Sequence, residues 1–276
     1  MYLTILNFKK MKKLYIYIIL VSVSILISCI DEISPDFEFE EQVFISGLLT
    51  SDAGFVSIQI QKTVPANDTS FGAINDAQVS LFMRDTSNTV SLVSDSFTVT
   101  NGVYETTELI APKIGNIYWI EVILQDQTIL RSEEEILKPP ILIKNMIKSE
   151  DHVRVTFIDQ IDEENFFLIR LDVFKDGTLI SDYWFVFDDT FVSENSEDYV
   201  EIDNINDGDT VRASIHNINF NTFQFYANVA NTLDDFALSS IFLPINIVGN
   251  ITNTATKELE LGYFGVAGFS TMTKDF

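Results

Sequence analysis

Apolar and polar residues alternate over short stretches in the first half of the chain. Turn signals such as Asn101-Gly102 and Gly115-Asn116 separate these stretches at near-regular intervals. Alternation with a period of two places every second side chain on a buried face, so the pattern predicts short β-strands. Many short strands separated by turns favour a β-sandwich of immunoglobulin or transthyretin type. The strands are expected at Gln42–Leu49, Phe55–Thr63, Ala77–Met83, Thr89–Val93, Val103–Glu105, Ile117–Leu124 and Thr128–Ser132.

Two consecutive prolines in Lys138-Pro139-Pro140 interrupt this pattern. Proline cannot donate a backbone hydrogen bond to a sheet and favours an extended connection. We therefore predict a domain boundary here, between an N-terminal β-sandwich domain over residues 42–138 and a C-terminal β-rich domain over residues 141–276. Asp176-Gly177 is a strong signal for a two-residue hairpin turn in the second domain. The strands of that domain are expected at Ile141–Lys148, His152–Ile158, Phe166–Lys175 and Thr178–Phe187.

One helix is predicted near residues 222–233, because Phe223, Tyr226 and Ala230 recur at helical spacing. We interpret its aromatic stripe as core packing. Asn221, with Gln224 three residues later, is the predicted cap of the first turn. The fold class expected for the whole chain is mainly β, with two β-sandwich-like domains and one short helix in the second.

The first 28 residues follow a different pattern. Lysines between Lys9 and Lys13 form a positive region, and the apolar run Leu14–Ile27 has the length expected for a secretory signal. Translation starts at Met1 or Met11. Residues 1–28 are therefore predicted to be a signal peptide, and an uncleaved transmembrane helix is the alternative.

The apolar run ends in Leu26-Ile27-Ser28-Cys29. This stretch resembles the bacterial lipobox, in which a cysteine thiol is acylated and a signal peptidase cuts before it. The resemblance implies that Cys29, the only cysteine of the chain, becomes a lipidated N-terminus held in the membrane by several acyl chains. Residues 29–41 then form an acidic tether. Asp31 and Glu32 in this tether resemble the surface-export signal of Bacteroidota lipoproteins, and periplasmic retention is the alternative.

The composition indicates a folded and strongly acidic protein. Hydrophobic residues make up 46% of the chain and include 23 Phe, which is far from a disordered composition. Four of the 17 basic residues lie in the first 28 residues, which hold no acid. The rest of the chain therefore has 13 basic residues against 41 acidic ones, a formal charge of about −28. This charge excludes nucleic acid as a partner.

The sequence contains little catalytic equipment. His152 and His216 are the only histidines, and Gly-x-Ser-x-Gly, His-Glu-x-x-His and a phosphate loop are absent. Runs of carboxylates such as Glu133-Glu134-Glu135 are interpreted as solvated loops, because adjacency does not place two carboxyls face to face. In the segment Asp203–Asp209, Ile205 occupies a ligand position of the calcium loop, so we predict a turn there. We expect no catalytic residue, no metal site and no cofactor.

The tail of the chain reads LPINIVGNITNTATKELELGYFGVAGFS and contains the terminal strand. The spacing of Gly262, Gly265 and Gly268 in it suggests a bent terminal strand or close approach of another backbone. This tail, the lipobox and the opening strand Ser46–Thr50 look like the "domain of unknown function 4249" family of Bacteroidota outer-membrane lipoproteins, over nearly the whole mature chain. The resemblance implies an outer-membrane lipoprotein that often accompanies TonB-dependent transporters, and it brings no catalytic residues.

We therefore expect a non-catalytic lipoprotein, anchored in the outer membrane by its lipid and exposed at the cell surface. Its expected role is that of an accessory or ligand-binding partner of a TonB-dependent nutrient transporter. A carboxylate-dependent surface glycoside hydrolase and a structural envelope component are the alternatives. The candidate binding residue is Trp184, because alternation sends it to the face opposite Tyr183 and Phe185. Burial of both faces in a sandwich is the other interpretation of this hairpin.

Overall fold

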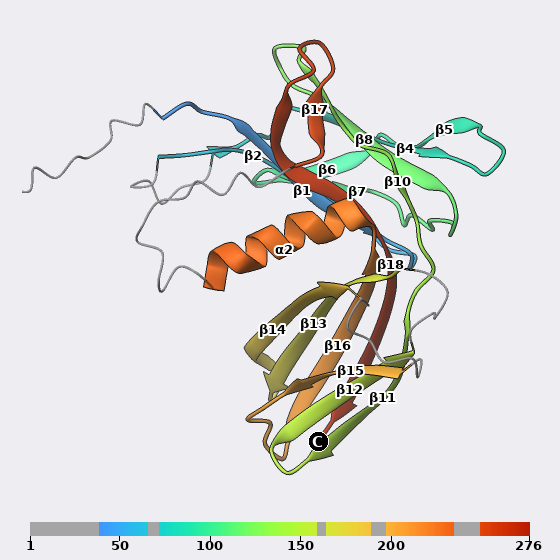
Figure 1. The fold of residues 1–276 in the computed structure, drawn as a ribbon. Coiled ribbons are helices and arrows are strands. Elements are labelled where there is room, and N and C mark those ends of the chain that lie inside the picture. The colour runs from blue at the N-terminus through green and yellow to red at the C-terminus, as the bar shows by residue number, and fades with distance from the viewer. Residues whose placement is uncertain (1–38, 66–71, 159–163, 189–196, 235–248) are drawn as a thin grey trace, which may run out of the picture. The chain divides into compact units, whose positions relative to one another are not determined.

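The computed structural model describes residues 39–65, 72–158, 164–188, 197–234 and 249–276. The signal peptide, Cys29, Asp31, Glu32 and most of the tether lie outside the described residues, so the predictions about them stay predictions. Residues Glu41–Phe276 form one compact unit. This unit is mainly β, and α2 is the one helix in the part of the chain that the structure describes (Figure 1). The predicted fold class is confirmed.

The N-terminal half is a β-sandwich built from one curled network of strands. The strands follow the order β5-β4-β8-β9-β17-β18-β1-β2-β7-β6, in which β17 (Ile251–Asn253) and β18 (Leu259–Asp275) come from the end of the chain. Side chains of β1 and β2 share a hydrophobic core with side chains of β4, β8 and β9, including Ile45, Ile60, Leu81 and Ile120. The strands of this half are β1 Val43–Thr50, β2 Ser57–Lys62, β3 Gly72–Ala73, β4 Gln78–Arg84, β5 Val90–Ser94, β6 Phe97–Thr100, β7 Val103–Thr106, β8 Ile117–Ile123, β9 Ile129–Ser132 and β10 Glu135–Ile136.

The C-terminal half packs a sheet in the order β14-β13-β16-β18 against a three-stranded sheet in the order β11-β12-β15. Phe157 of one sheet and Phe167 of the other lie in the shared core, with ring centroids 5.3 Å apart. The elements are β11 Leu142–Ser149, β12 His152–Ile158, β13 Phe166–Lys175, β14 Thr178–Asp188, β15 Glu197–Ile202, β16 Asp209–Ile218, α2 Phe220–Asp234, β17 Ile251–Asn253 and β18 Leu259–Asp275. The turn between β13 and β14 has positive φ at Asp176 and Gly177, which confirms the predicted hairpin.

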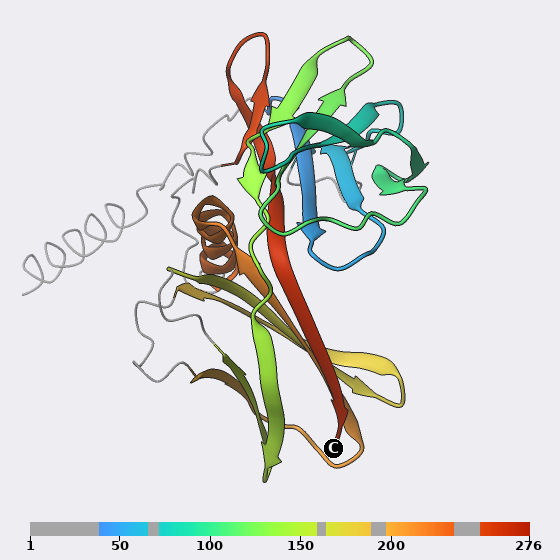
Figure 2. The ribbon, with the colours of Figure 1, turned by 90° about the vertical axis from the view of Figure 1, so that its right-hand side faces the viewer.

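Strand β18 belongs to both halves (Figure 2). Its first part pairs in parallel with β1, from Leu261 to Ala267, and its last part pairs antiparallel with β16, from Ala267 to Asp275. The close backbone approach predicted for the tail glycines is present at Gly262 and Gly268, whereas a Cβ on Gly265 would meet side chains of Leu48 and Thr222. Gly262 has φ +103°, and a Cβ there would lie 1.9 Å from the Ile45 carbonyl oxygen. A Cβ on Gly268 would lie 2.3 Å from the Pro139 carbonyl oxygen. Only glycine fits at these two positions.

The hydrophobic core changes where the sequence predicts a domain boundary. Leu137 belongs to the core of the N-terminal half, and Ile141 belongs to the core of the C-terminal half. Hydrogen bonding nevertheless continues across this point through β18. The Lys138-Pro139-Pro140 segment therefore marks a change of core, and the division into two domains stays a prediction.

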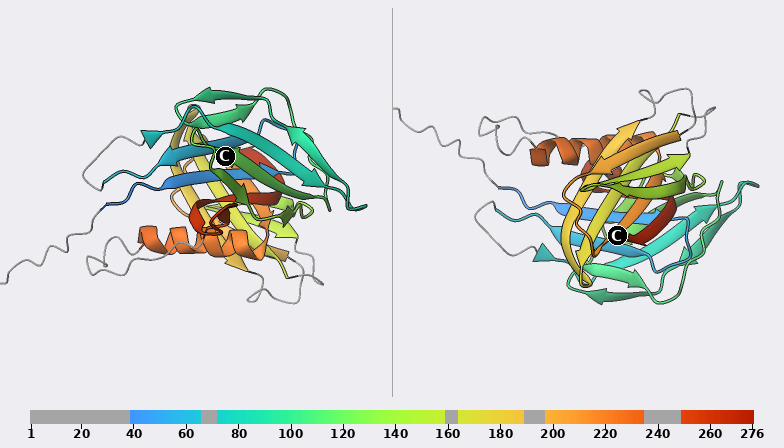
Figure 3. Two further views of the ribbon diagram at one scale, coloured as in Figure 1. Left: turned by 90° about the horizontal axis from the view of Figure 1, so that it is seen from above. Right: turned by 90° about the horizontal axis from the view of Figure 1, so that it is seen from below.

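Helix α2 covers part of the outer face of the β14-β13-β16-β18 sheet (Figure 3). Alternation along β13 sends Phe166 and Leu168 towards α2, whereas Phe167 faces the three-stranded sheet. The ring of Phe223 lies 5.1 Å from that of Phe166, which confirms core packing of the aromatic stripe. The predicted cap was wrong: the helix begins at Phe220, so Asn221 lies inside its first turn.

Candidate functional site

Trp184 lies on β14 with 49% of its surface exposed. Its neighbours Tyr183, Phe185 and Phe187 pack against the core between the two C-terminal sheets. The alternation predicted from the sequence is thus confirmed, and the interpretation with both faces buried is wrong. A large aromatic side chain on a solvent-facing side of a sheet is suited to contact a partner or a ligand.

Arg170 on β13 stands directly opposite Trp184 in the sheet. Its guanidinium carbon lies 5.0 Å from the centroid of the Trp184 ring, a distance at which the cation and the π-system attract. Trp184 donates from its indole Nε1 to Asp182 Oδ2 at 2.9 Å. The ring therefore has a fixed orientation although half of its surface is open to solvent.

Asp172 holds two arginines on the same face. Its side chain is only 3% exposed and accepts from Arg170 Nε at 2.6 Å through Oδ1 and from Arg212 Nη2 at 2.5 Å through Oδ2. The Arg212 guanidinium lies over the Phe174 ring at 5.0 Å. The register explains the arrangement, because Asp172 faces Arg212 on β16 while the next outward residue of β13, Arg170, faces Trp184. We refer to Trp184, Arg170, Asp172, Arg212 and Phe174 as the Trp184 face.

The Trp184 face combines an open aromatic ring with two fixed guanidinium groups. The side chains of Arg170 and Arg212 are 34% and 48% exposed, so N–H groups that do not reach Asp172 remain accessible. Guanidinium groups recognise carboxylates through paired hydrogen bonds, and tryptophan and arginine are the residue types that dominate protein interfaces. This arrangement can bind a partner or a ligand through its aromatic ring and its guanidinium groups.

A second tryptophan, Trp119, lies at the outer face of the N-terminal sheet and was not singled out from the sequence. It is only 3% exposed. The Phe82 ring stacks on it at 5.6 Å, and the guanidinium carbons of Arg84 and Arg131 lie 5.7 and 4.9 Å from its centroid. Its Nε1 is buried and has no hydrogen-bond partner. Alternation in β8 was the available signal, because Trp119 stands between the core residues Tyr118 and Ile120.

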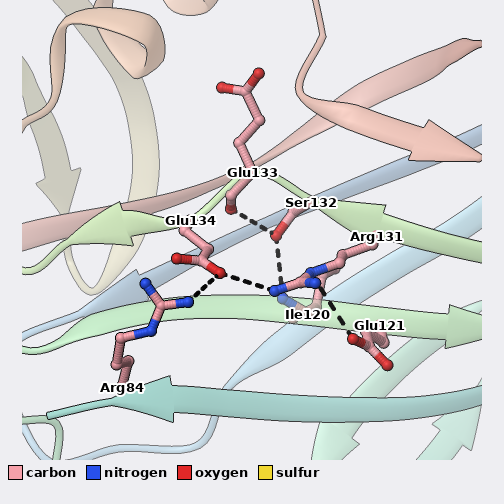
Figure 4. Close-up of polar contacts among 7 residues, drawn as sticks. All are labelled: Arg84, Ile120, Glu121, Arg131, Ser132, Glu133 and Glu134. Atoms are coloured by element: carbon pink, nitrogen blue, oxygen red, sulfur yellow. Dashed lines mark hydrogen bonds and ion pairs between the residues drawn. The ribbon is translucent and has the colours of Figure 1, made fainter. Parts of the chain in front are cut away.

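The two arginines beside Trp119 converge on one carboxylate (Figure 4). Arg84 Nη2 and Arg131 Nη2 both donate to Glu134 Oε1, at 2.7 and 2.8 Å. Arg131 also lies 3.7 Å from Glu121 Oε1. We refer to Trp119, Phe82, Arg84, Arg131, Glu121 and Glu134 as the Trp119 face.

The interpretation of the acidic run 133–135 as a solvated loop was wrong for Glu135. Its side chain is buried and accepts hydrogen bonds from Val266 N at 3.0 Å, from Thr222 Oγ1 at 2.9 Å and from the Tyr263 hydroxyl. Burial raises the pKa of Glu135, and burial next to this carboxyl also raises the pKa of Tyr263. Because its donors come from α2 and β18, Glu135 joins β10 to both elements.

The two histidines and the segment 203–209 lie apart from both tryptophans. Within the described residues, no three His, Cys, Asp or Glu side chains are grouped to hold a metal ion. His152 is partly exposed beside Asp151, while burial lowers the pKa of His216, whose Nδ1 lies 3.0 Å from the Leu168 carbonyl oxygen. Ile205 is buried and Gly208 has φ +90°, which confirms a turn in the segment 203–209.

An open hollow of about 670 Å³ lies at one end of the N-terminal half. Three of its lining residues are acidic, Glu41, Asp76 and Asp126, and the Glu41 carboxylate pairs with Lys62 at 2.6 Å. Neither tryptophan lines this hollow.

No helix among the described residues is long and apolar enough to span a bilayer. A search of curated proteins finds no match to this chain. Among solved structures, the chain is similar to a DUF3823 family protein from Parabacteroides merdae, at 10% identity and a TM-score of 0.21, over 63% of this chain and 90% of that one. A DUF3823 family protein from Bacteroides ovatus gives 8% identity and a TM-score of 0.20 over 63% and 90% of the two chains.

A Salmonella alpha-2-macroglobulin mutant also aligns, at 9% identity and a TM-score of 0.21, over 65% of this chain and 14% of that one. A match to a protein family covers more of this chain than these three structures do. A family model described as a domain of unknown function (DUF4249) matches residues 30–273, from the tether into β18. The chain therefore belongs to the DUF4249 family, as its tail and opening strand predicted.

Proposed function

We propose that this protein is a non-catalytic outer-membrane lipoprotein that serves as an accessory or ligand-binding partner of a TonB-dependent nutrient transporter. The lipid on Cys29 anchors the chain, and Asp31 and Glu32 direct it to the cell surface. The support for this anchor is the sequence Leu26-Ile27-Ser28-Cys29 after a basic and an apolar segment. A tethered domain meets a membrane partner at high effective concentration, so a weak interface is sufficient.

The Trp184 face is the observation that carries the binding role. Trp184 is exposed on β14, which pairs only with β13 among the described strands, so the ring lies on an edge strand of the described sheet. Asp172 keeps both arginines in place before a partner arrives. Such pre-organisation reduces the entropy lost on binding. The face therefore favours recognition over chemistry.

The glycoside hydrolase alternative has weaker support. That reaction needs two carboxyl groups facing each other across the scissile bond at a set separation. Glu135 is enclosed by donors from α2 and β18, and Asp172 is engaged by two arginines. Neither carboxyl is positioned to face a substrate together with a second acid.

The test is co-purification from native outer membrane solubilised in mild detergent. We expect the wild-type chain to bring down a TonB-dependent channel, and Trp184→Ala to reduce the recovered channel about tenfold, as for a central interface tryptophan. Tyr199→Ala is the matched control, because Tyr199 is 56% exposed on β15 and lies under Arg154 at 4.3 Å. This control should retain the channel.

Two results would contradict the proposal. One is a wild-type protein recovered alone, with growth unaffected by deletion on every nutrient tried. The other is an equal loss of the channel in Trp184→Ala and Tyr199→Ala, which would show that the Trp184 face does not mediate the contact with the channel.

A further inference from the structure

Exposed aliphatic side chains flank the Trp119 face. Leu92 on β5 is the cross-strand neighbour of Phe82, and Val90 is that of Arg84. Ile136 on β10 pairs with Ile117, which in turn pairs with Arg84. Directly paired residues project to the same side of a sheet, so these side chains form one band with the Trp119 face.

This band exposes three large aliphatic side chains to solvent. Leu92, Val90 and Ile136 are 50%, 53% and 47% exposed, on strands to either side of β4 and β8. Isolated exposed aliphatic residues are ordinary, but a contiguous band around a tryptophan and two arginines has the composition of an interface centre.

The polar atoms at the centre of this band are open to a partner at the ion pairs. Trp119 Nε1 is buried beneath Phe82, Arg84 and Arg131, so it stays inside the copy that carries it. The side chains of Arg84, Arg131 and Glu134 are 30%, 37% and 28% exposed. Glu134 uses Oε1 for both of its arginine bonds, so its Oε2 is left for a further donor. The ion pairs of the Trp119 face therefore offer accessible donors and an accessible acceptor together.

The charges of the Trp119 face balance locally. Arg84 and Arg131 are matched by Glu121 and Glu134, whereas the chain after residue 28 carries about −28. Two copies of such an acidic protein repel each other over most of their surface. At this face, by contrast, each copy meets both signs of charge, and a two-fold interface requires such a self-complementary patch.

We propose that the Trp119 face and its aliphatic flanks are the interface of a two-fold homodimer. In the dimer, the arginines of each copy reach carboxylates of the other copy. Leu92, Val90 and Ile136 become buried around this polar centre. The Trp184 face belongs to the C-terminal sheet and takes no part in this interface.

Sedimentation velocity of the full chain in mild detergent, over a range of protein concentrations, tests this inference. We expect a dimer for the wild type and at least tenfold weaker association for Leu92→Asp. Ile147→Asp is the matched control, because Ile147 is 54% exposed on β11 in the other half, and it should remain dimeric. A monomeric wild type at every concentration, or a Leu92→Asp variant that dimerises like the wild type, would overturn the proposal.

Charge reversal separates an interface from a folding defect. Arg84→Glu alone and Glu134→Arg alone should each be folded monomers, because each places like charges opposite one another in a symmetric pair. Mixing the two variants should restore dimers, since opposite charges then meet across the two-fold axis. Failure of the mixture to associate, with both variants folded by circular dichroism, would contradict the symmetric arrangement.

Discussion

The two tryptophans of the chain occupy similar surroundings but differ in exposure. Each lies on the outward side of a sheet beside arginines that share one carboxylate, Asp172 near Trp184 and Glu134 near Trp119. Trp184 is 49% exposed and Trp119 is 3% exposed. The position of the strand explains this difference. β14 has one neighbouring strand, whereas β8 lies between β4 and β9, whose side chains cover the ring from both sides.

Strand order therefore decides how much of an outward-facing tryptophan is exposed to a partner. Side-chain alternation is local, but the number of neighbouring strands depends on pairing between distant segments. At a sheet edge the ring remains available to a partner. In the sheet interior the ring becomes a platform covered by cations, and its apolar flanks provide the contact surface instead.

The largest effect is expected for truncation of the covered ring. Trp119→Ala should lower the free energy of unfolding by about 3–5 kcal/mol, because it removes a buried aromatic ring with its stacked neighbours. Trp184→Ala should change it by about 1 kcal/mol or less, since half of that ring is already solvated. Urea unfolding followed by circular dichroism measures both values. Similar losses in the two variants would show that exposure does not separate the two sites.

Replacement of the carboxylate that joins the arginines should cost more stability near Trp184 than near Trp119, which reverses the order expected for the two tryptophans. Asp172→Asn should cost about 2–3 kcal/mol, which is less than a fully buried pair because both arginines are partly exposed. Glu134→Gln should cost about 0–1 kcal/mol, since the Glu134 side chain is 28% exposed. The same urea titration applies. A larger loss in Glu134→Gln than in Asp172→Asn would contradict the burial argument.

Glu135 on β10, in the half of the molecule that carries Trp119, makes the free energy of unfolding depend on pH. Its folded-state pKa is raised by burial above the ordinary value of 4.5. The folded state therefore binds this proton more tightly, and the stability from Glu135 is complete below about pH 4.5 and is lost as the pH rises through the raised pKa. Glu135→Gln cannot ionise, so its stability should fall less steeply than that of the wild type above pH 4.5. Parallel stability profiles of the two proteins from pH 4.5 to 7.5 would contradict this assignment.

The smallest effect is expected at the contact between Arg170 and Trp184. Arg170→Ala should lower stability by about 0.5–1 kcal/mol, because Trp184 loses its cation–π contact and Asp172 loses one partner but stays paired with Arg212. It should also increase acrylamide quenching of Trp184 fluorescence in a Trp119→Phe background. Arg131→Ala in a Trp184→Phe background gives the counterpart, where Phe82 and Arg84 continue to cover Trp119 and quenching should stay low. Equal increases in quenching at the two tryptophans would contradict the different cover of the two rings.

Several local features were predictable because neighbouring residues decide them. The hairpin at Asp176-Gly177 follows from residues that tolerate positive φ, and α2 follows from apolar spacing. The outward direction of Trp184 follows from a period of two. The cap of α2 was mispredicted because Asn219 and Asn221 are both suitable residues by type. Asn221 donates to Glu133 and Asn219 to Glu135, contacts with residues more than 80 positions away.

The mainly β class, the alternating faces, the hairpin and the helix follow from residues close together in the chain, and family membership follows from segments spread along it. The pairing of β18 with both β1 and β16, the burial of Glu135 against α2 and the cover of Trp119 by two arginines depend on the folded arrangement. These contacts join residues from 12 positions apart, as for Arg131 and Trp119, to 217 positions apart, as for Phe44 and Leu261. Backbone period and turn chemistry act over a few residues, so they set which way a side chain points but not which distant side chain it meets.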